Sequence, residues 1–399
     1  MRALAIGVAV ALLGCGDDDA AKDTAADTSV TETVATDTST TETAVTDTEV
    51  PEVAPDTADT AETVEEVEVT PPCSERPNPF VYPDDAEAWR HYDQSSQIAA
   101  LDPPNHRGQD VIIKAGEPQV LVAKFAYGLT DTDMKDEDVS IWMQREPPCG
   151  LWEHMGDFRT SVEDQYGTTY GIEDDGGRVF FEIPEAQRFP VGRYPVRMVL
   201  KGDLTMAAFD LIVVEPGTQA IVTDIDGTLT TGDEELILEL IMEFFNETYV
   251  QHPYPDADRM LELWESKGYL IVYITGRPDP LRPMTERWVE PRFPPGPMHL
   301  TDTNTQAIPK DENVGTYKKE FVQYLQAQGL DIVAAYGNAT TDIYAYEQAG
   351  IPKATTFIIG NHRGEAETQP LQGGYTDHLP WVEARPAATK PAPPAFGWW

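Results

Sequence analysis

The chain has 399 residues, enough for two folded domains, and its 28 Lys and Arg stand against 69 Asp and Glu, a net charge of −41. This charge excludes a nucleic-acid backbone as the main partner, and it excludes adhesion to an anionic membrane through charge, because both require a basic surface. Residues 17–72 contribute −16 of the charge and residues 73–399 contribute −26, so the folded part is acidic too.

Residues 1–15 predict a secretory signal peptide. Arg2 precedes an apolar run over residues 3–13, which is too short to span a bilayer as a helix. Leu-Leu-Gly-Cys at 12–15 resembles the bacterial lipobox, which implies lipidation of Cys15 and anchoring in the bacterial cell envelope. Gly16 in place of Asp favours the outer membrane over the inner one. The alternative is an ordinary signal peptide with an incidental cysteine.

Residues 16–72 predict a disordered, acidic, Thr-rich tether. Residues 17–72 hold 15 Thr and 17 acidic residues but no aromatic residue, so they have too little apolar surface to offset the entropy of ordering. Like charges extend such a linker. A glycosylated or cation-binding stalk is the functional alternative.

The chain has three cysteines, Cys15, Cys73 and Cys149. With Cys15 acylated, two remain in an oxidising compartment, which favours a Cys73–Cys149 disulfide. Two unpaired thiols are the alternative, and neither cysteine has a partner at metal-site spacing.

Residues 73–217 predict an all-β sandwich of the immunoglobulin-like kind. Short apolar or alternating runs are separated by Pro and Gly, as in strands joined by turns. The runs are 111–113, 120–127, 139–143, 179–183, 194–200 and 207–214. His91, His106 and His154 are scattered without ligand spacing, so we expect an accessory domain without chemistry.

Residues 218–383 predict an α/β domain, in which buried strands alternate with helices and form a parallel sheet covered on both faces. The expected strands are 220–223, 269–274, 332–336 and 354–359, and the expected helices are 234–249, 255–267, 317–328 and 341–348. Residues 278–310 are Pro-rich and predict an irregular insert rather than a full cap domain. Residues 384–399 predict a mobile Pro-rich tail ending in Trp398 and Trp399.

Polar residues follow three of these strands, and ligands bind at the carboxyl ends of parallel strands. After the first strand, Asp224 is placed to attack phosphorus as a nucleophile, and Asp226 to protonate the leaving oxygen and then activate water. Gly227 allows a turn beside the substrate, and Thr228 can hydrogen-bond Asp226. Two carboxylates facing a phosphate require a cation, and Mg²⁺ suits an oxygen-only site formed by Asp224, Asp226 and Asp342.

The second strand and the following helix supply phosphate ligands. Thr275 offers a hydroxyl and Gly276 a backbone N–H to phosphate oxygens. Lys318 or Lys319 can neutralise charge that develops on the phosphoryl group, and Lys318 is the better candidate because it shares a helix face with Val322.

Asn338 follows the third of these strands, and we expect it to support the site. Asp342, four residues later, completes the shell of the metal.

In this order the motifs resemble those of the haloacid-dehalogenase phosphatase superfamily, and more narrowly the lipin domain. The narrower resemblance is carried by Asp-Ile-Asp-Gly-Thr-Leu-Thr at 224–230, Tyr-Ile-Thr-Gly-Arg-Pro-Asp at 273–279 and Tyr-Gly-Asn with Asp-Ile-Tyr-Ala-Tyr over 336–346. That domain occurs in magnesium-dependent phosphatidate phosphatases and in retinal-degeneration-type phosphatidylinositol transfer proteins. The resemblance implies a capless Rossmann-like fold.

Transfer-protein versions often lack the first Asp and are thought to bind phosphatidate without cleaving it, whereas this chain keeps Asp224 and Asp226. The resemblance therefore implies a Mg²⁺-dependent phosphatase that acts on phosphatidate or a related phosphomonoester. The alternatives are a non-catalytic module that binds phosphatidate or phosphoinositide, and a structural envelope protein.

Overall fold

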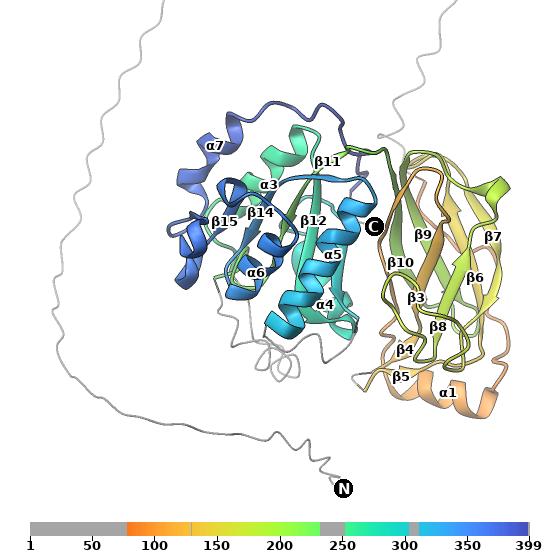
Figure 1. The fold of residues 1–399 in the computed structure, drawn as a ribbon. Coiled ribbons are helices and arrows are strands. Elements are labelled where there is room, and N and C mark those ends of the chain that lie inside the picture. The colour runs from red at the N-terminus through yellow and green to blue at the C-terminus, as the bar shows by residue number, and fades with distance from the viewer. Residues whose placement is uncertain (1–77, 129, 232–251, 303–310, 398–399) are drawn as a thin grey trace, which may run out of the picture. The chain divides into compact units, whose positions relative to one another are not determined.

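The computed structural model describes residues 78–128, 130–231, 252–302 and 311–397. A β-rich region is followed by a region of alternating strands and helices (Figure 1). Within those ranges, no helix combines the length and the apolar character that crossing a membrane requires.

The β-rich region is a sandwich. In the described residues, one sheet has the strand order β2-β10-β9-β6-β7 and the other β1-β3-β8, with a separate β4-β5 ribbon. Helix α1 (Tyr92–Leu101) precedes them. The strands are β1 (Arg107–Gly108), β2 (Val111–Lys114), β3 (Val120–Lys124), β4 (Ala126–Tyr127), β5 (Thr132–Asp133), β6 (Asp138–Gln144), β7 (Trp152–Arg159), β8 (Arg178–Glu182), β9 (Gly192–Leu200) and β10 (Met206–Val214).

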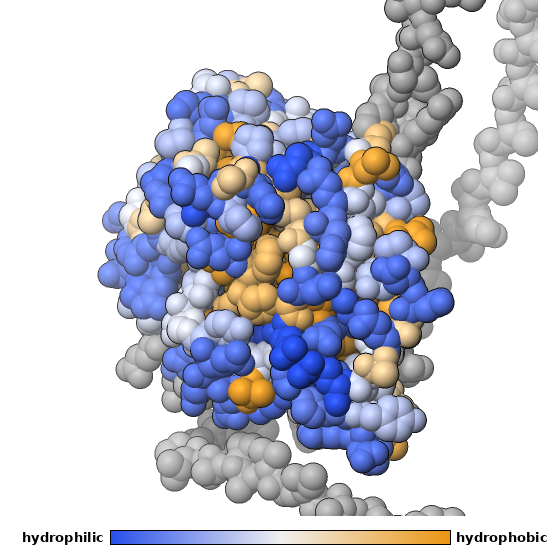
Figure 2. Space-filling model, turned by 90° about the vertical axis from the view of Figure 1, so that its right-hand side faces the viewer, coloured by the Kyte–Doolittle hydropathy of each residue, from blue (hydrophilic) through white to orange (hydrophobic). Residues whose placement is uncertain are grey.

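The sandwich core follows the two-residue period of its strands. Val139, Ile141 and Met143 of β6 are all buried in one cluster, since alternate residues of a strand face the same side. Strand β7 is absent from the predicted set because it is an edge strand with mostly exposed or half-exposed residues, and therefore lacks an apolar pattern. Figure 2 views the side where β6 and β7 lie, and hydrophilic residues cover most of this face around apolar ones near its middle.

The second region holds six described strands in one parallel sheet, ordered β13-β12-β11-β14-β15-β16. In chain order this is the doubly wound arrangement 3-2-1-4-5-6, whose direction reverses between β11 and β14. The sandwich and the parallel α/β domain that the sequence predicts are thus confirmed. The strands are β11 (Gln219–Thr223), β12 (Leu270–Pro278), β13 (Met298–Thr301), β14 (Asp331–Gly337), β15 (Thr356–Ile358) and β16 (Gln369–Pro370).

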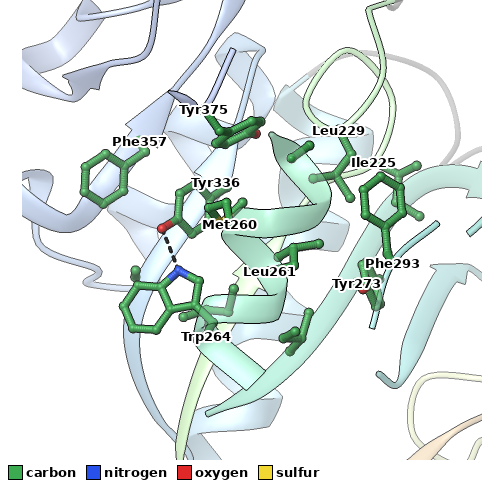
Figure 3. Close-up of a cluster of buried hydrophobic side chains, with 14 of the residues drawn as sticks. Ile225, Leu229, Met260, Leu261, Trp264, Tyr273, Phe293, Tyr336, Phe357 and Tyr375 are labelled. Carbon is green, nitrogen blue, oxygen red and sulfur yellow. Dashed lines mark hydrogen bonds between the residues drawn. The ribbon is translucent and has the colours of Figure 1, made fainter. Parts of the chain in front are cut away.

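Helices cover both faces of this sheet. Helices α5 (Thr316–Ala327) and α6 (Thr340–Gln348) pack on one face with Ala220 and Val222 of β11. Helices α3 (Ala257–Ser266), α4 (Arg282–Val289) and α7 (Leu379–Glu383) contribute to the cluster on the other face, which contains Ile221. Alternate residues of one strand thus serve opposite faces, and Figure 3 shows the second cluster around Trp264.

The expectation that residues 278–310 form an irregular insert is wrong. Residues 278–310 contain α4 and the edge strand β13, because buried Arg282 anchors α4 through hydrogen bonds to Glu286, the Met298 carbonyl and Asp110 of the sandwich. The helix expected at 234–249 lies outside the described residues.

The Pro-rich tail is also ordered through Gly397. Its backbone bonds to the α/β domain: the Ala388 N–H donates to the Lys267 carbonyl (2.8 Å), and the Gln219 N–H donates to the Lys390 carbonyl (3.0 Å). A Pro-rich segment shows neither a helix nor a strand pattern, so such contacts cannot be predicted from its sequence.

We predict that Tyr336→Phe destabilises the fold. The Tyr336 hydroxyl accepts a hydrogen bond from the Trp264 indole (2.8 Å; Figure 3). It also lies 3.0 Å from Nε2 of His378, and all three side chains are buried. Its loss leaves a buried indole N–H unpaired, so we expect a loss of about 1–3 kcal/mol in urea-induced unfolding. Tyr92→Phe, at a residue 67% exposed, should change stability by less than about 0.5 kcal/mol. Equal midpoints for both variants would contradict this.

Candidate active site at the reversal point of the parallel sheet

The predicted site residues gather where the strand order reverses. Asp224 follows β11 and Asn338 follows β14, and these two strands are neighbours in the sheet. At such a point the loops leave in opposite directions and open a crevice at the carboxyl ends of the strands. The backbone joins them as well, since the Asp224 N–H donates to the Tyr336 carbonyl (3.0 Å).

The ammonium group of Lys318 joins Asp224 to Asp342. Nζ of Lys318 on α5 lies 2.8 Å from Oδ1 of Asp224 and 2.7 Å from Oδ1 of Asp342 on α6. All three side chains are at most 3% exposed. Lys319 instead lies near Glu320 on the surface (3.6 Å), so the structure places Lys318, and not its neighbour, in the site.

Thr228 holds Asp224, and the expectation that it bonds Asp226 is wrong. Its hydroxyl lies 2.9 Å from Oδ2 of Asp224 and 3.1 Å from Oδ1 of Asn338. Gly227 has φ +70°, a left-handed conformation that glycine adopts without strain, and the resulting turn brings Thr228 back toward Asp224.

Asp342 is fixed by backbone groups. Its Oδ2 accepts hydrogen bonds from the N–H groups of Asn338 (3.0 Å) and Ala339 (3.1 Å), at the start of α6. The carboxylate folds so closely over Gly337 that a Cβ there would meet Cβ of Asp342 at 2.4 Å. Only glycine fits this position, and it allows Asp342 to turn toward Lys318.

Asp226 is paired with a residue that the sequence analysis does not place in the site. Nε of Arg277 donates to its Oδ2 (2.8 Å) and Nη2 to its Oδ1 (2.6 Å), and both side chains are buried. The expectation that the Asp226 side chain stays free for proton transfer is therefore wrong for this structure. Arg277 stands in the Thr-Gly-Arg-Pro segment, where a charged residue within an otherwise buried strand is the signal for a buried ion pair.

Thr275 and Gly276 lie inside β12 rather than beyond its end. The Thr275 hydroxyl donates to Oδ2 of Asp226 (3.2 Å) and accepts the N–H of Arg277 (3.1 Å), so in this structure it serves the ion pair. A Cβ on Gly276 would lie 3.3 Å from Cγ1 of Val314. Phosphate binding by these two residues stays a prediction.

The site carries more negative than positive charge. Three carboxylates, of Asp224, Asp226 and Asp342, stand against two cations, Lys318 and Arg277. Burial raises the pKa of Asp224 to about 8, with Asp342 and Asp226 acting in the same direction and Lys318 opposing them. The arrangement therefore favours an additional cation.

The residues present fit a Mg²⁺ ion held by two carboxylates. The part of the chain that is described contains no group of three or more His, Cys, Asp or Glu side chains able to hold a metal ion, and Asp226 is paired with Arg277. The predicted site of three carboxylates is therefore not formed among these residues. Asp224 and Asp342, however, contact the same Nζ, and Mg²⁺ is usually bound by one or two carboxylates together with waters and substrate phosphate. These two residues would hold it.

Cys149 is disulfide-bonded. Cys15 and Cys73 lie outside the described residues, so the pairing with Cys73 and the lipidation of Cys15 stay predictions.

The fold and site define a β-sandwich followed by a lipin-like α/β domain. Residues 104–213 match the family model described as the PITM 1-3 beta-sandwich domain, and residues 221–360 match the PITM 1-3 LNS2 domain.

The chain is also similar to curated proteins. The chain is 32% identical to membrane-associated phosphatidylinositol transfer protein 1 of Rattus norvegicus over 73% of this chain and 21% of the relative. It is 32% identical to membrane-associated phosphatidylinositol transfer protein 3 of Homo sapiens over 70% of this chain and 26% of the relative. It is 30% identical to protein retinal degeneration B of Drosophila melanogaster over 70% of this chain and 20% of the relative. The chain thus spans about a fifth to a quarter of the length of these relatives. Among solved structures, a superoxide reductase from Ignicoccus hospitalis T24K is 10% identical over 30% of this chain and 90% of that one, with a TM-score of 0.18, which carries no argument.

We predict that Arg277→Ala destabilises the α/β domain. Its removal leaves the buried Asp226 carboxylate without its bidentate partner, which costs about 3–5 kcal/mol in urea-induced unfolding. Arg259→Ala is the matched control, because that ion pair with Glu383 is exposed and longer (3.6 Å), and its loss should cost less than about 1 kcal/mol. Similar small losses for both variants would show that the Arg277 pair is absent in solution.

Proposed function

We propose that the α/β domain hydrolyses phosphomonoesters with Mg²⁺, through an aspartyl-phosphate on Asp224, and that its substrate is phosphatidate or a related phospholipid. The observation that carries the proposal is the Lys318 ammonium shared by Asp224 and Asp342. It supports the roles proposed here, in which Asp224 is the nucleophile, Lys318 the cation for the phosphoryl oxygens and Asp342 the second metal ligand. The proposal includes a fold and a reaction of the haloacid-dehalogenase type for this domain.

The chemistry follows from the side chains. An Asp224 carboxylate oxygen forms a bond to phosphorus while the bond from phosphorus to the ester oxygen breaks, and the departing alkoxide takes a proton from Asp226. Water, deprotonated by Asp226, then attacks the phosphorus and releases phosphate and the Asp224 carboxylate. Lys318 stabilises the charge on the phosphoryl oxygens. Mg²⁺, when bound, supplies further charge neutralisation.

A phospholipid substrate is supported by the names of the relatives, which are phosphatidylinositol transfer proteins. A lipid anchor on Cys15 and a place in the bacterial envelope, with the outer membrane favoured, belong to the same proposal. They would hold the domain near its substrate.

One observation favours a second function, a non-catalytic module that binds anionic phospholipid. The bidentate pair with Arg277 stabilises the ionised form of Asp226, and a carboxylate cannot donate a proton. For turnover, substrate must draw Arg277 or Asp226 away from this pair. If the pair persists, the site binds phosphate without cleaving it.

We predict that the purified chain releases phosphate from short-chain phosphatidate with Mg²⁺ and not with EDTA. Asp224→Asn should lower the rate by about 10³-fold or more, because an amide is a poor nucleophile. The control is Asp331→Asn, at an exposed residue at the opposite end of β14, which should keep the wild-type rate. Equal rates for both variants would show that Asp224 is not the nucleophile.

We predict further that the rate depends only weakly on the basicity of the leaving group across aryl and alkyl phosphates, because Asp226 protonates it. Release from aryl phosphates alone would mean that Arg277 keeps Asp226 ionised throughout. No release from either class, together with retention of the protein on phosphatidate vesicles, would establish the binding module instead.

A further inference from the structure

A cavity lies beside helix α5, and its described lining shares no residue with the Asp224 site. Its volume is about 370 Å³. Aromatic and acidic side chains line it, among them Tyr170, Tyr317, Phe321, Tyr324, Asp302 and Glu320. Tyr170 comes from the sandwich and the others from the α/β domain.

The hydroxyl groups of the three lining tyrosines are each hydrogen-bonded to the protein. The Tyr170 hydroxyl accepts the backbone N–H of Val120 (3.1 Å), and that of Tyr324 donates to a backbone carbonyl of β2 (2.6 Å). The Tyr317 hydroxyl lies 2.5 Å from Nδ1 of His299. The cavity is therefore lined by rings whose hydroxyl groups are anchored to the protein.

The rings are continuous with one another. The Tyr324 ring centre lies 5.9 Å from those of both Tyr170 and Phe321, and the ring of His299 lies 3.7 Å from that of Phe321. Burial lowers the pKa of His299 to about 3, so this ring is uncharged at neutral pH. Aromatic faces carry the negative part of the ring quadrupole.

The described lining contains acids and no Lys or Arg. Glu320 is largely exposed at one side, 3.6 Å from Lys319, which stands outside the lining. Asp302 is more enclosed, and its burial, with Asp279 adding and Arg178 opposing, raises its pKa to about 7. A bound cation would be attracted by the rings and by Glu320, and by Asp302 in its ionised form.

We propose that this cavity binds a quaternary ammonium group, as in choline or a choline headgroup. Such a cation has methyl groups and no hydrogen-bond donors, so it gains from ring faces and nearby negative charge and needs no free acceptor lone pairs. A metal ion, in contrast, takes its ligands from oxygen atoms and makes no use of an aromatic lining. The inference does not depend on phosphatase activity.

The test compares choline with 3,3-dimethylbutan-1-ol, a neutral molecule of the same shape, by calorimetric titration of the whole chain. We expect saturable choline binding at least about tenfold tighter than binding of the neutral analogue. No saturable choline binding, or equal binding of the two, overturns the proposal. Short-chain phosphatidylcholine and free choline, titrated alone and in competition, show which source of the group binds better.

Two variants locate the binding. Phe321→Leu removes a ring face, and Glu320→Gln removes a charge at an exposed position, so each should weaken choline binding about three- to tenfold. Glu347→Gln is the matched control, because that side chain is similarly exposed, on α6, outside the lining. Thermal unfolding checks that Phe321→Leu is folded. Unchanged choline affinity in Glu320→Gln and Phe321→Leu places the binding elsewhere and overturns the proposal.

Discussion

The Lys318 ammonium is the contact on which the site depends. It draws together the end of β11, the start of α5 and the first turn of α6, because Asp224 and Asp342 bond the same Nζ. Without this cation two buried carboxylates would face each other, and unpaired buried charge is strongly destabilising. The surrounding details serve the same contact: Gly337 admits the Asp342 side chain, and Thr228 occupies the second oxygen of Asp224.

This part of the site was predictable from sequence because its signals are local. Each of Asp224 and Asn338 directly follows a buried strand, and the topology of a parallel sheet brings strand ends to one edge. Lys318 shares a helix face with apolar residues, which indicated that it points inward. The convergence therefore needed only the order of the elements and no knowledge of distances.

The Arg277 pair was not predictable in the same way. Its partner Asp226 lies about 50 residues away, and nothing local shows which of several acids a buried guanidinium will meet. For the same reason the partner of Thr228 was misassigned, since both aspartates are within reach along the chain. Strand β13 and the ordered tail depend on contacts with distant elements, which a local pattern does not show.

The two cations of the site hold their carboxylates differently. An ammonium is a compact charge with three donors, and Lys318 can move from two carboxylates toward an incoming phosphate. A guanidinium is a planar fork, and Arg277 occupies both oxygens of Asp226 at once. In the proposed reaction, phosphate binding thus requires a small rearrangement at Lys318, whereas proton transfer requires a larger one at Arg277.

Helix α5 connects this site to the aromatic cavity. Successive residues of a helix turn by about 100°, so Lys318 faces the Asp224 site while Tyr317, Phe321 and Tyr324 line the cavity on another side. In the two proposals made above, the same helix positions the ammonium group for phosphate and the rings for a quaternary ammonium group.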